Sequence, residues 1–115
     1  MTEKENLKII YNAIADKKGE RIKILDISEI SPIADYFIIT NGNNKNQVQA
    51  IADNVNDEML KLGIHPERVE GFNTAGWILM DYNNVVVHIF SKDDRFFYDL
   101  ERIWSDGRTI DAEEL

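Results

Sequence analysis

Few residues in this chain have the types and the spacing that catalysis requires. The sequence has no cysteine, which excludes disulfides, thiolate zinc sites and cysteine nucleophiles. Of its two histidines, His65 precedes a proline and His88 lies inside the apolar run Val-Val-Val-His-Ile-Phe. A catalytic histidine needs a nucleophile or a metal beside it, and no group of histidines and carboxylates has metal-ligand spacing. We therefore predict no metal site and a structural role for His88.

The turn at Gly42 invites a phosphate-binding interpretation. Asn41-Gly42-Asn43-Asn44 lies between an extended run and a helical pattern, and backbone N–H groups at such a turn can bind an anion. The segment nevertheless lacks both the P-loop pattern and the dinucleotide-binding pattern. We expect the glycine to serve the turn itself, and we predict no nucleotide cofactor.

A nucleotidyltransferase is the sharpest enzyme hypothesis. Such enzymes place a Gly-Ser pair at a turn of this kind and two carboxylates, one residue apart, on the neighbouring strand, where they hold metal ions. Here Asn43 follows Gly42, and Asp81 has Leu79 at the alternate position. One carboxylate cannot build a two-metal site. We predict that the chain is not an enzyme, with a nucleotide-binding or nucleotidyltransferase-like enzyme as the alternative.

The elements that must position these residues alternate between helical and extended patterns. A helix is predicted from an apolar stripe formed by Leu7, Ile10, Tyr11, Ile14 and Ala15. A second helix follows Asn44, and a third runs from Ser91 to Gly107. Strands are predicted at residues 21–27, 36–40, 69–72, 77–82 and 85–90. The sum is an α/β domain over residues 1–107, with a mixed sheet of about five strands flanked by helices, and a flexible tail over residues 108–115.

The strand at residues 77–82 has large apolar groups on both faces. Ile78, Met80 and Tyr82 point one way, and Trp77, Leu79 and Asp81 point the other. The strand is therefore either covered on both sides or keeps one face for a partner. On the last predicted helix Arg95, Tyr98, Asp99 and Arg102 are surface neighbours, which fits a solvated face or an interface.

The bulk properties favour a soluble protein whose partner is basic. The 115 residues fit one small domain, and no apolar run approaches the roughly 20 residues of a membrane span. The first residues lack a signal-peptide pattern, so we expect a cytoplasmic protein without a membrane partner. The net charge of −8 argues against binding by phosphate neutralisation, which predicts little direct contact with nucleic acid. It suits a basic protein partner or simple solubility.

Several sequence blocks together resemble one known family. They are Ala-Asp-Tyr-Phe-Ile-Ile-Thr-Asn-Gly-Asn at residues 34–43, Gln-Val-Gln-Ala-Ile-Ala-Asp at 47–53, Glu-Gly at 70–71 with Gly-Trp-Ile-Leu-Met-Asp-Tyr at 76–82, and the stretches 85–90 and 95–104. In order and spacing these blocks resemble the ribosomal silencing factors, also called Iojap-like proteins. The resemblance covers nearly the whole chain.

The resemblance implies a function that composition does not show. Family members bind ribosomal protein fourteen of the large ribosomal subunit, block its association with the small subunit and repress translation when nutrients are scarce. The implied fold is related to nucleotidyltransferases but lacks their catalytic carboxylates. We expect Glu70 and Asp81 to face basic side chains of the partner, and a strand face left exposed could pair two copies off the ribosome. The full set of expected partner-binding residues is Glu70, Gly76, Trp77, Leu79, Asp81, Tyr82, Tyr98 and Arg102.

Overall fold

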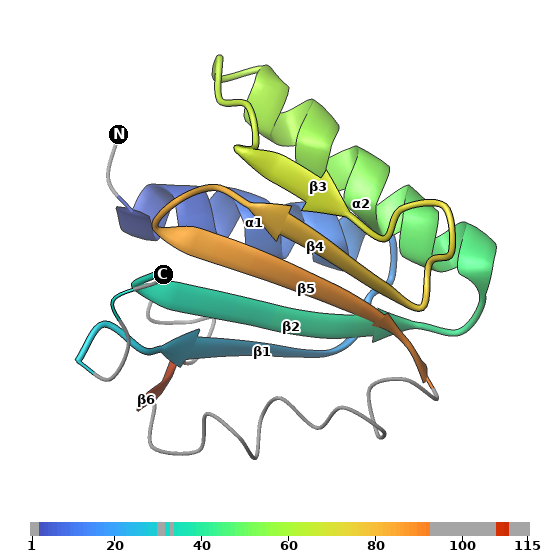
Figure 1. The fold of residues 1–115 in the computed structure, drawn as a ribbon, viewed down its shortest axis with the longest axis horizontal. Helices are drawn as coiled ribbons and strands as arrows, with labels where there is room; N and C mark the ends of the chain where they lie inside the picture. The colour runs from blue at the N-terminus through green and yellow to red at the C-terminus, as the bar shows by residue number, and fades with distance from the viewer. Residues whose placement is uncertain (1–2, 30–31, 33, 93–107, 111–115) are drawn as a thin grey trace.

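The computed structural model describes residues 3–29, 32, 34–92 and 108–110 of the chain. Within these ranges six strands form one sheet in the order β3-β4-β5-β2-β1-β6, and two helices accompany it (Figure 1). The elements in chain order are α1 (Glu3–Asp16), β1 (Glu20–Asp26), β2 (Tyr36–Gly42), α2 (Lys45–Leu60), β3 (Arg68–Glu70), β4 (Trp77–Asp81), β5 (Val85–Ser91) and β6 (Arg108–Ile110). This is the mixed α/β architecture that the alternating patterns predicted.

The centre of the sheet is the parallel pair of β2 and β5. All other neighbours are antiparallel. β2 lies between β5 and β1, and its residues from Phe37 to Gly42 are buried. A continuous apolar run is typical of such an interior strand, and this confirms the strand predicted at residues 36–40.

A sixth strand was not expected. Residues 108–110, which we expected to belong to a flexible tail, form β6 and pair with Ile24 to Asp26 of β1. Ile110 is buried in the core beside Ile24. Three residues are too few for periodicity to show a strand, so the tail prediction fails for residues 108–110. The helix predicted from Ser91 to Gly107 lies almost wholly outside the described residues.

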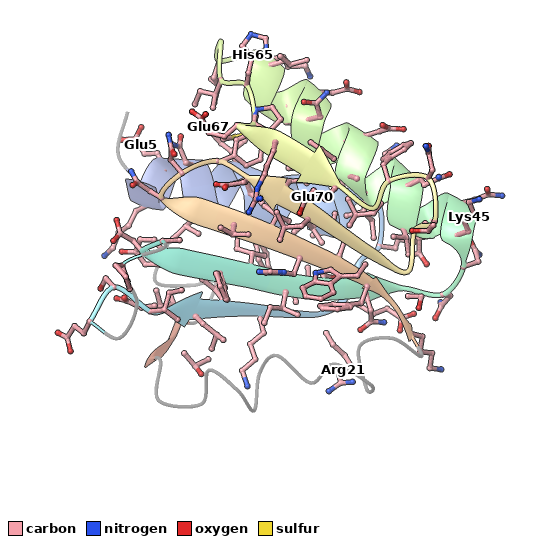
Figure 2. All side chains as sticks on the ribbon, viewed as in Figure 1. Glu5, Arg21, Lys45, His65, Glu67 and Glu70 are labelled. Carbon is pink, nitrogen blue, oxygen red and sulfur yellow. The ribbon has the colours of Figure 1, made fainter. Side chains whose placement is uncertain are left out.

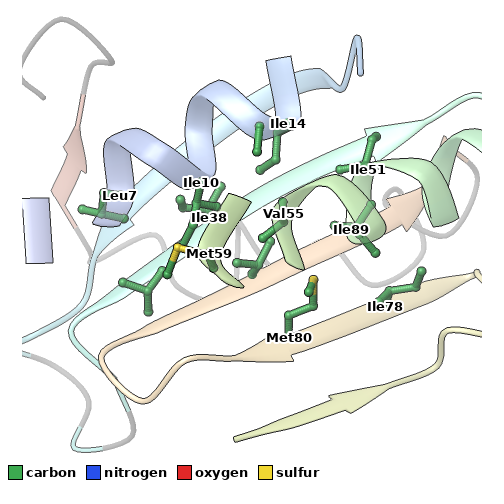
Figure 3. Packing of buried hydrophobic residues seen from close by; sticks show 14 of the residues in the cluster. Leu7, Ile10, Ile14, Ile38, Ile51, Val55, Met59, Ile78, Met80 and Ile89 are labelled. Atoms are coloured by element: carbon green, nitrogen blue, oxygen red, sulfur yellow. The ribbon is translucent and has the colours of Figure 1, made fainter. Parts of the chain in front are cut away.

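Both described helices pack on the same face of the sheet, and their contact with it is aliphatic. Leu7, Ile10 and Ile14 of α1 are fully buried there, but Ala15 is exposed and Ala13 is buried instead. From α2 the buried residues are Val48, Ile51, Ala52, Val55 and Met59. Figure 3 shows Ile51, Val55 and Met59 of α2 in one cluster with Ile38 of β2, Ile89 of β5, and Ile78 and Met80 of β4. We call the strand residues of this layer the helix face: Ile24, Ile38, Ile78, Met80, Val87 and Ile89.

A tight hairpin joins β4 to β5 and fixes their register. Asn83 has a φ of 71°, which asparagine tolerates better than most residues. The amide of Tyr82 donates to the carbonyl of Val85 across the turn at 2.9 Å. The two-residue link therefore places Trp77 opposite Phe90 and Leu79 opposite His88.

Candidate functional site

The face of the sheet opposite the helices carries a group of aromatic side chains beside the aliphatic residues Leu25, Ile39 and Val86. Phe37 of β2 and His88 and Phe90 of β5 lie on it, and Trp77 and Leu79 of β4 are packed half-buried beside them. We call these five residues, Phe37, Trp77, Leu79, His88 and Phe90, the aromatic face. On the strand at residues 77–82, Ile78 and Met80 on the helix side are buried, whereas Trp77 and Leu79 on the other side are only partly buried. That this second side is kept for a partner stays a prediction.

Trp77 is held by its two neighbours on β5. Its indole stacks on Phe90 with ring centroids 5.1 Å apart and planes inclined by 25°. Its indole N–H donates to Nδ1 of His88 at 3.0 Å. His88 in turn meets Phe37 edge to face, with centroids 4.6 Å apart. Aromatic pairs at these separations attract one another beyond simple area burial, so Trp77 is a positioned side chain rather than a loose surface group.

His88 is a buried, neutral histidine. Its side chain is 4% exposed, and this burial lowers its pKa to about 4 because the charged ring loses its hydration. Its Nε2 has no hydrogen-bond partner among the described residues. The structural role predicted for His88 agrees with this geometry. Figure 2 places His65 on the loop after α2, so the two histidines do not share a site.

The acidic residues at the edge of the aromatic face are already partly engaged. Oδ1 of Asp81 accepts from the backbone N–H of Asn83 at 2.8 Å, and its Oδ2 lies 3.6 Å from Nε of Arg68. Arg68 also approaches Glu70, whose oxygen is 3.7 Å from its guanidinium. Asp81 therefore stabilises the hairpin turn through its bond to Asn83. Glu70, on the edge strand β3 (Figure 2), is the more exposed of the two acids.

Gly76 and Tyr82 bracket β4 rather than lie on the aromatic face. The carbonyl of Gly76 accepts from the amide of Ser91 at 2.9 Å, which ties the start of β4 to the end of β5. Tyr82 packs, half-buried, against the helix-face core. Its hydroxyl has no partner among the described residues, and burial raises its pKa to about 12. Tyr98 and Arg102 lie outside the described residues, as do Arg95 and Asp99.

The Gly42 turn is filled by a side chain of the protein itself. Oε1 of Gln47 accepts from the backbone N–H of Asn43 at 2.7 Å. Oδ1 of Asn44 caps α2 by accepting from the backbone N–H of Gln47. The side-chain nitrogen of Gln47, Nε2, donates to the backbone carbonyls of Lys17 and Lys18. The amide of Asn43, which a phosphate would need, is therefore already satisfied, and Gln47 joins two turns instead.

The single candidate carboxylate is at the wrong end of the sheet for phosphoryl transfer. Gly42 pairs with Ser91 at the end of β5, whereas Asp81 pairs with Val86 near its beginning. Five residues of strand separate these positions, or about 16 Å at 3.3 Å per residue. Within the described ranges no three histidines, aspartates or glutamates gather into a possible metal site. No helix there is long and apolar enough to cross a membrane.

Two contacts of the site were missed by sequence reasoning. Arg68 between the acids could not be foreseen, because β3 begins one residue earlier than predicted. The bond between Trp77 and His88 could have been found. A two-residue hairpin at Asn83-Asn84 puts Leu79 opposite His88, which makes Trp77 its diagonal neighbour within reach of an aromatic side chain.

The fold and site define a small α/β domain with an aromatic face of which Trp77 and Leu79 remain partly exposed, and with no catalytic set assembled among the described residues. The family described as "Ribosomal silencing factor during starvation" matches residues 1–115. The chain belongs to this family of ribosomal silencing factors.

Individual relatives agree with the family assignment. The ribosomal silencing factor of Bacillus subtilis is 45% identical over 113 residues, covering 98% of this chain and 96% of that protein. A crystal structure of protein CV0518 from Chromobacterium violaceum is similar with a TM-score of 0.89 at 31% identity, covering 91% of this chain and 88% of that one. A distant relative from Mus musculus, named mitochondrial assembly of ribosomal large subunit protein 1, is 21% identical over 105 residues, which are 89% of this chain and 46% of that protein.

Proposed function

We propose that this chain binds the large ribosomal subunit at ribosomal protein fourteen and sterically blocks association with the small subunit, repressing translation under nutrient limitation. The observation that carries the proposal is the aromatic face, where Trp77 and Leu79 are packed but only partly buried beside an acidic edge. The name of the Mus musculus relative, which refers to the large ribosomal subunit, supports the choice of subunit.

The composition of this face suits a protein partner better than RNA. Tryptophan is among the residues that contribute most to protein–protein binding when they are rigid and partly buried. The net charge of −8 opposes close contact with phosphates. Glu70, with 60% of its side chain exposed, can attract a basic protein surface. No nucleotide or metal is required for a steric block.

Co-sedimentation tests the docking step. The wild-type chain is expected to pellet with purified large subunits but much less with intact ribosomes, because the small subunit covers the same surface. Trp77→Ala should lose most of this binding. Val69→Ala is the matched control, since Val69 is an exposed apolar residue that lies on the neighbouring strand and faces the groove beside α2.

Two further measurements decide how the result is understood. A urea titration of each variant reports whether Trp77→Ala remains folded, and only folded protein enters the affinity comparison. Adding the chain to separated subunits should reduce the yield of joined ribosomes in a sucrose gradient. Failure of the wild-type chain to pellet with free large subunits would refute the proposal.

The acidic edge is tested separately by salt. Glu70→Gln removes one exposed charge without touching the hairpin that Asp81 holds. Affinity for large subunits should fall at low salt, and the difference from wild type should vanish near 0.5 M salt, where charges are screened over a few ångströms. Equal affinities for the two proteins at low salt would remove Glu70 from the interface.

A further inference from the structure

We propose that His88 is a positioning residue of the docking surface, which holds the indole of Trp77 in one orientation by accepting its N–H at Nδ1. This inference rests on the proposed docking through the aromatic face. It concerns a buried residue that touches no partner and acts only through Trp77.

The hydrogen bond assigns the tautomer of His88. The indole nitrogen of Trp77 is always a donor, so Nδ1 at 3.0 Å must carry a lone pair. A neutral imidazole then carries its proton on Nε2. Burial keeps the ring neutral, because its pKa is lowered to about 4. At neutral pH the acceptor for the indole is therefore always present.

The surrounding rings give His88 a fixed place from which to accept. Phe37 lies edge-on to it at 4.6 Å, and Phe90 lies nearly parallel to it with centroids 6.4 Å apart. Phe90 also stacks on Trp77. Stacking alone leaves an indole free to flip about its side-chain bonds, since both flips can stack. The directional bond to Nδ1 selects one of them.

Placing a histidine at this buried position lowers the stability of the fold, which indicates that the residue has another role. Nε2–H of His88 is buried without an acceptor among the described residues, and an unsatisfied buried donor lowers stability. A phenylalanine at this position would fill a similar volume without that loss. The stability lost through Nε2–H is offset by the pre-orientation of Trp77, because a side chain ordered before binding loses less entropy on binding.

Nuclear magnetic resonance of the free, ¹⁵N-labelled full chain tests the bond directly. The chain has two tryptophans, and Trp77→Phe identifies which indole signal is lost. We expect a ¹⁵N–¹⁵N coupling across the hydrogen bond from Trp77 to His88, slow deuterium exchange of that indole N–H, and imidazole signals of the Nε2–H tautomer. A proton on Nδ1, or no coupling in the folded wild type, would overturn the inference whatever the ribosome binds.

Two variants separate the acceptor from the ring. His88→Phe keeps a ring between Phe37 and Phe90 but removes the acceptor, whereas His88→Asn loses the ring and keeps an oxygen near the place of Nδ1. Affinity for large subunits should fall about 3- to 10-fold in His88→Phe, the loss expected for one side chain that must be ordered on binding. His88→Asn should restore much of it and keep the slow indole exchange.

The outcomes distinguish this inference from the proposed function. If Trp77→Ala loses binding while His88→Phe binds like wild type, docking stands and the positioning role is wrong. If His88→Asn loses more affinity than His88→Phe, ring packing and not the hydrogen bond is the cause, which also refutes the role. If neither Trp77→Ala nor His88→Phe alters binding although the coupling is seen, the proposed docking face is wrong, and with it the positioning role.

Discussion

The residues of the helix face and those of the aromatic face differ in side-chain type and in how far they are buried. The helix face is aliphatic, and each of its six residues is at most 2% exposed beneath α1 and α2. The aromatic face carries a buried histidine, and two of its members, Trp77 and Leu79, are only partly buried. Residues of the two faces alternate along the same strands. The difference between the faces therefore lies in their side chains and not in the backbone.

We propose that the two faces divide stability and recognition between them. Aliphatic side chains between a sheet and two helices gain free energy in proportion to the area they bury, with little need for direction. Aromatic rings also gain free energy from burial, but their preferred ring geometries and the hydrogen bond between Trp77 and His88 hold them in a defined shape. We expect the helix face to determine folding and the aromatic face to determine binding.

The largest test compares neighbours on β4. Ile78 points to the helix face and is fully buried, while Leu79 points to the aromatic face and is half-buried. Ile78→Ala should lower the free energy of unfolding by about 4 kcal/mol, since it leaves a cavity under the helices. Leu79→Ala should cost about 1 kcal/mol but weaken binding to large subunits. Urea titration and co-sedimentation measure the two effects, and equal stability losses would abolish the distinction.

The next largest effect concerns the loop that leads into Trp77. Gly71 has a φ of +79°, and a Cβ there would collide with the carbonyl oxygen of Trp77. Gly71→Ala should cost about 3 kcal/mol, because overpacking adds to the strain of a left-handed backbone. Gly63 is the matched control, since it has a φ of +74° with open space around it. Gly63→Ala should cost only about 1 kcal/mol, and thermal unfolding compares the pair.

Acid should weaken the fold through His88 specifically. An unfolded histidine binds a proton below pH 6.5, but the folded ring does so only below about pH 4. Between these values protons favour the unfolded state, so stability falls by about 1.4 kcal/mol per pH unit, or about 3 kcal/mol in total. His88→Phe lacks this contribution. Urea titrations from pH 7 to pH 4 should show a shallower loss in His88→Phe, and parallel curves would mean that His88 titrates normally.

The smallest effect belongs to the acidic edge. Arg68 lies within 4 Å of both Glu70 and Asp81 and offsets part of their charge. Arg68→Ala should make the edge of the aromatic face more negative and raise affinity for a basic partner about two- to threefold at low salt, as exposed ion pairs are worth less than about 1 kcal/mol. Weaker binding in a salt series would show instead that Arg68 is itself a contact.

Local patterns predicted most of the described fold. The spacing of Ile10 and Ile14 marked the buried side of α1, the run from Phe37 marked the central strand, and Asn83-Asn84 marked the hairpin. These succeed because helix and strand periods are local properties of a few consecutive residues. The absence of a second carboxylate beside Asp81 was equally visible, because it concerns residue types alone.

What the sequence determined by itself was therefore the set of described elements except β6, the burial of β2 and the apolar character of both sides of β4. The tertiary structure alone decided that Gln47 fills the Gly42 turn and that Asp81 lies far from that turn. It also decided that residues 108–110 join the sheet and that His88 accepts the hydrogen bond of the Trp77 indole. Each of these depends on which strands become neighbours and in what register. Such pairings join residues distant in the chain, and no local period encodes them.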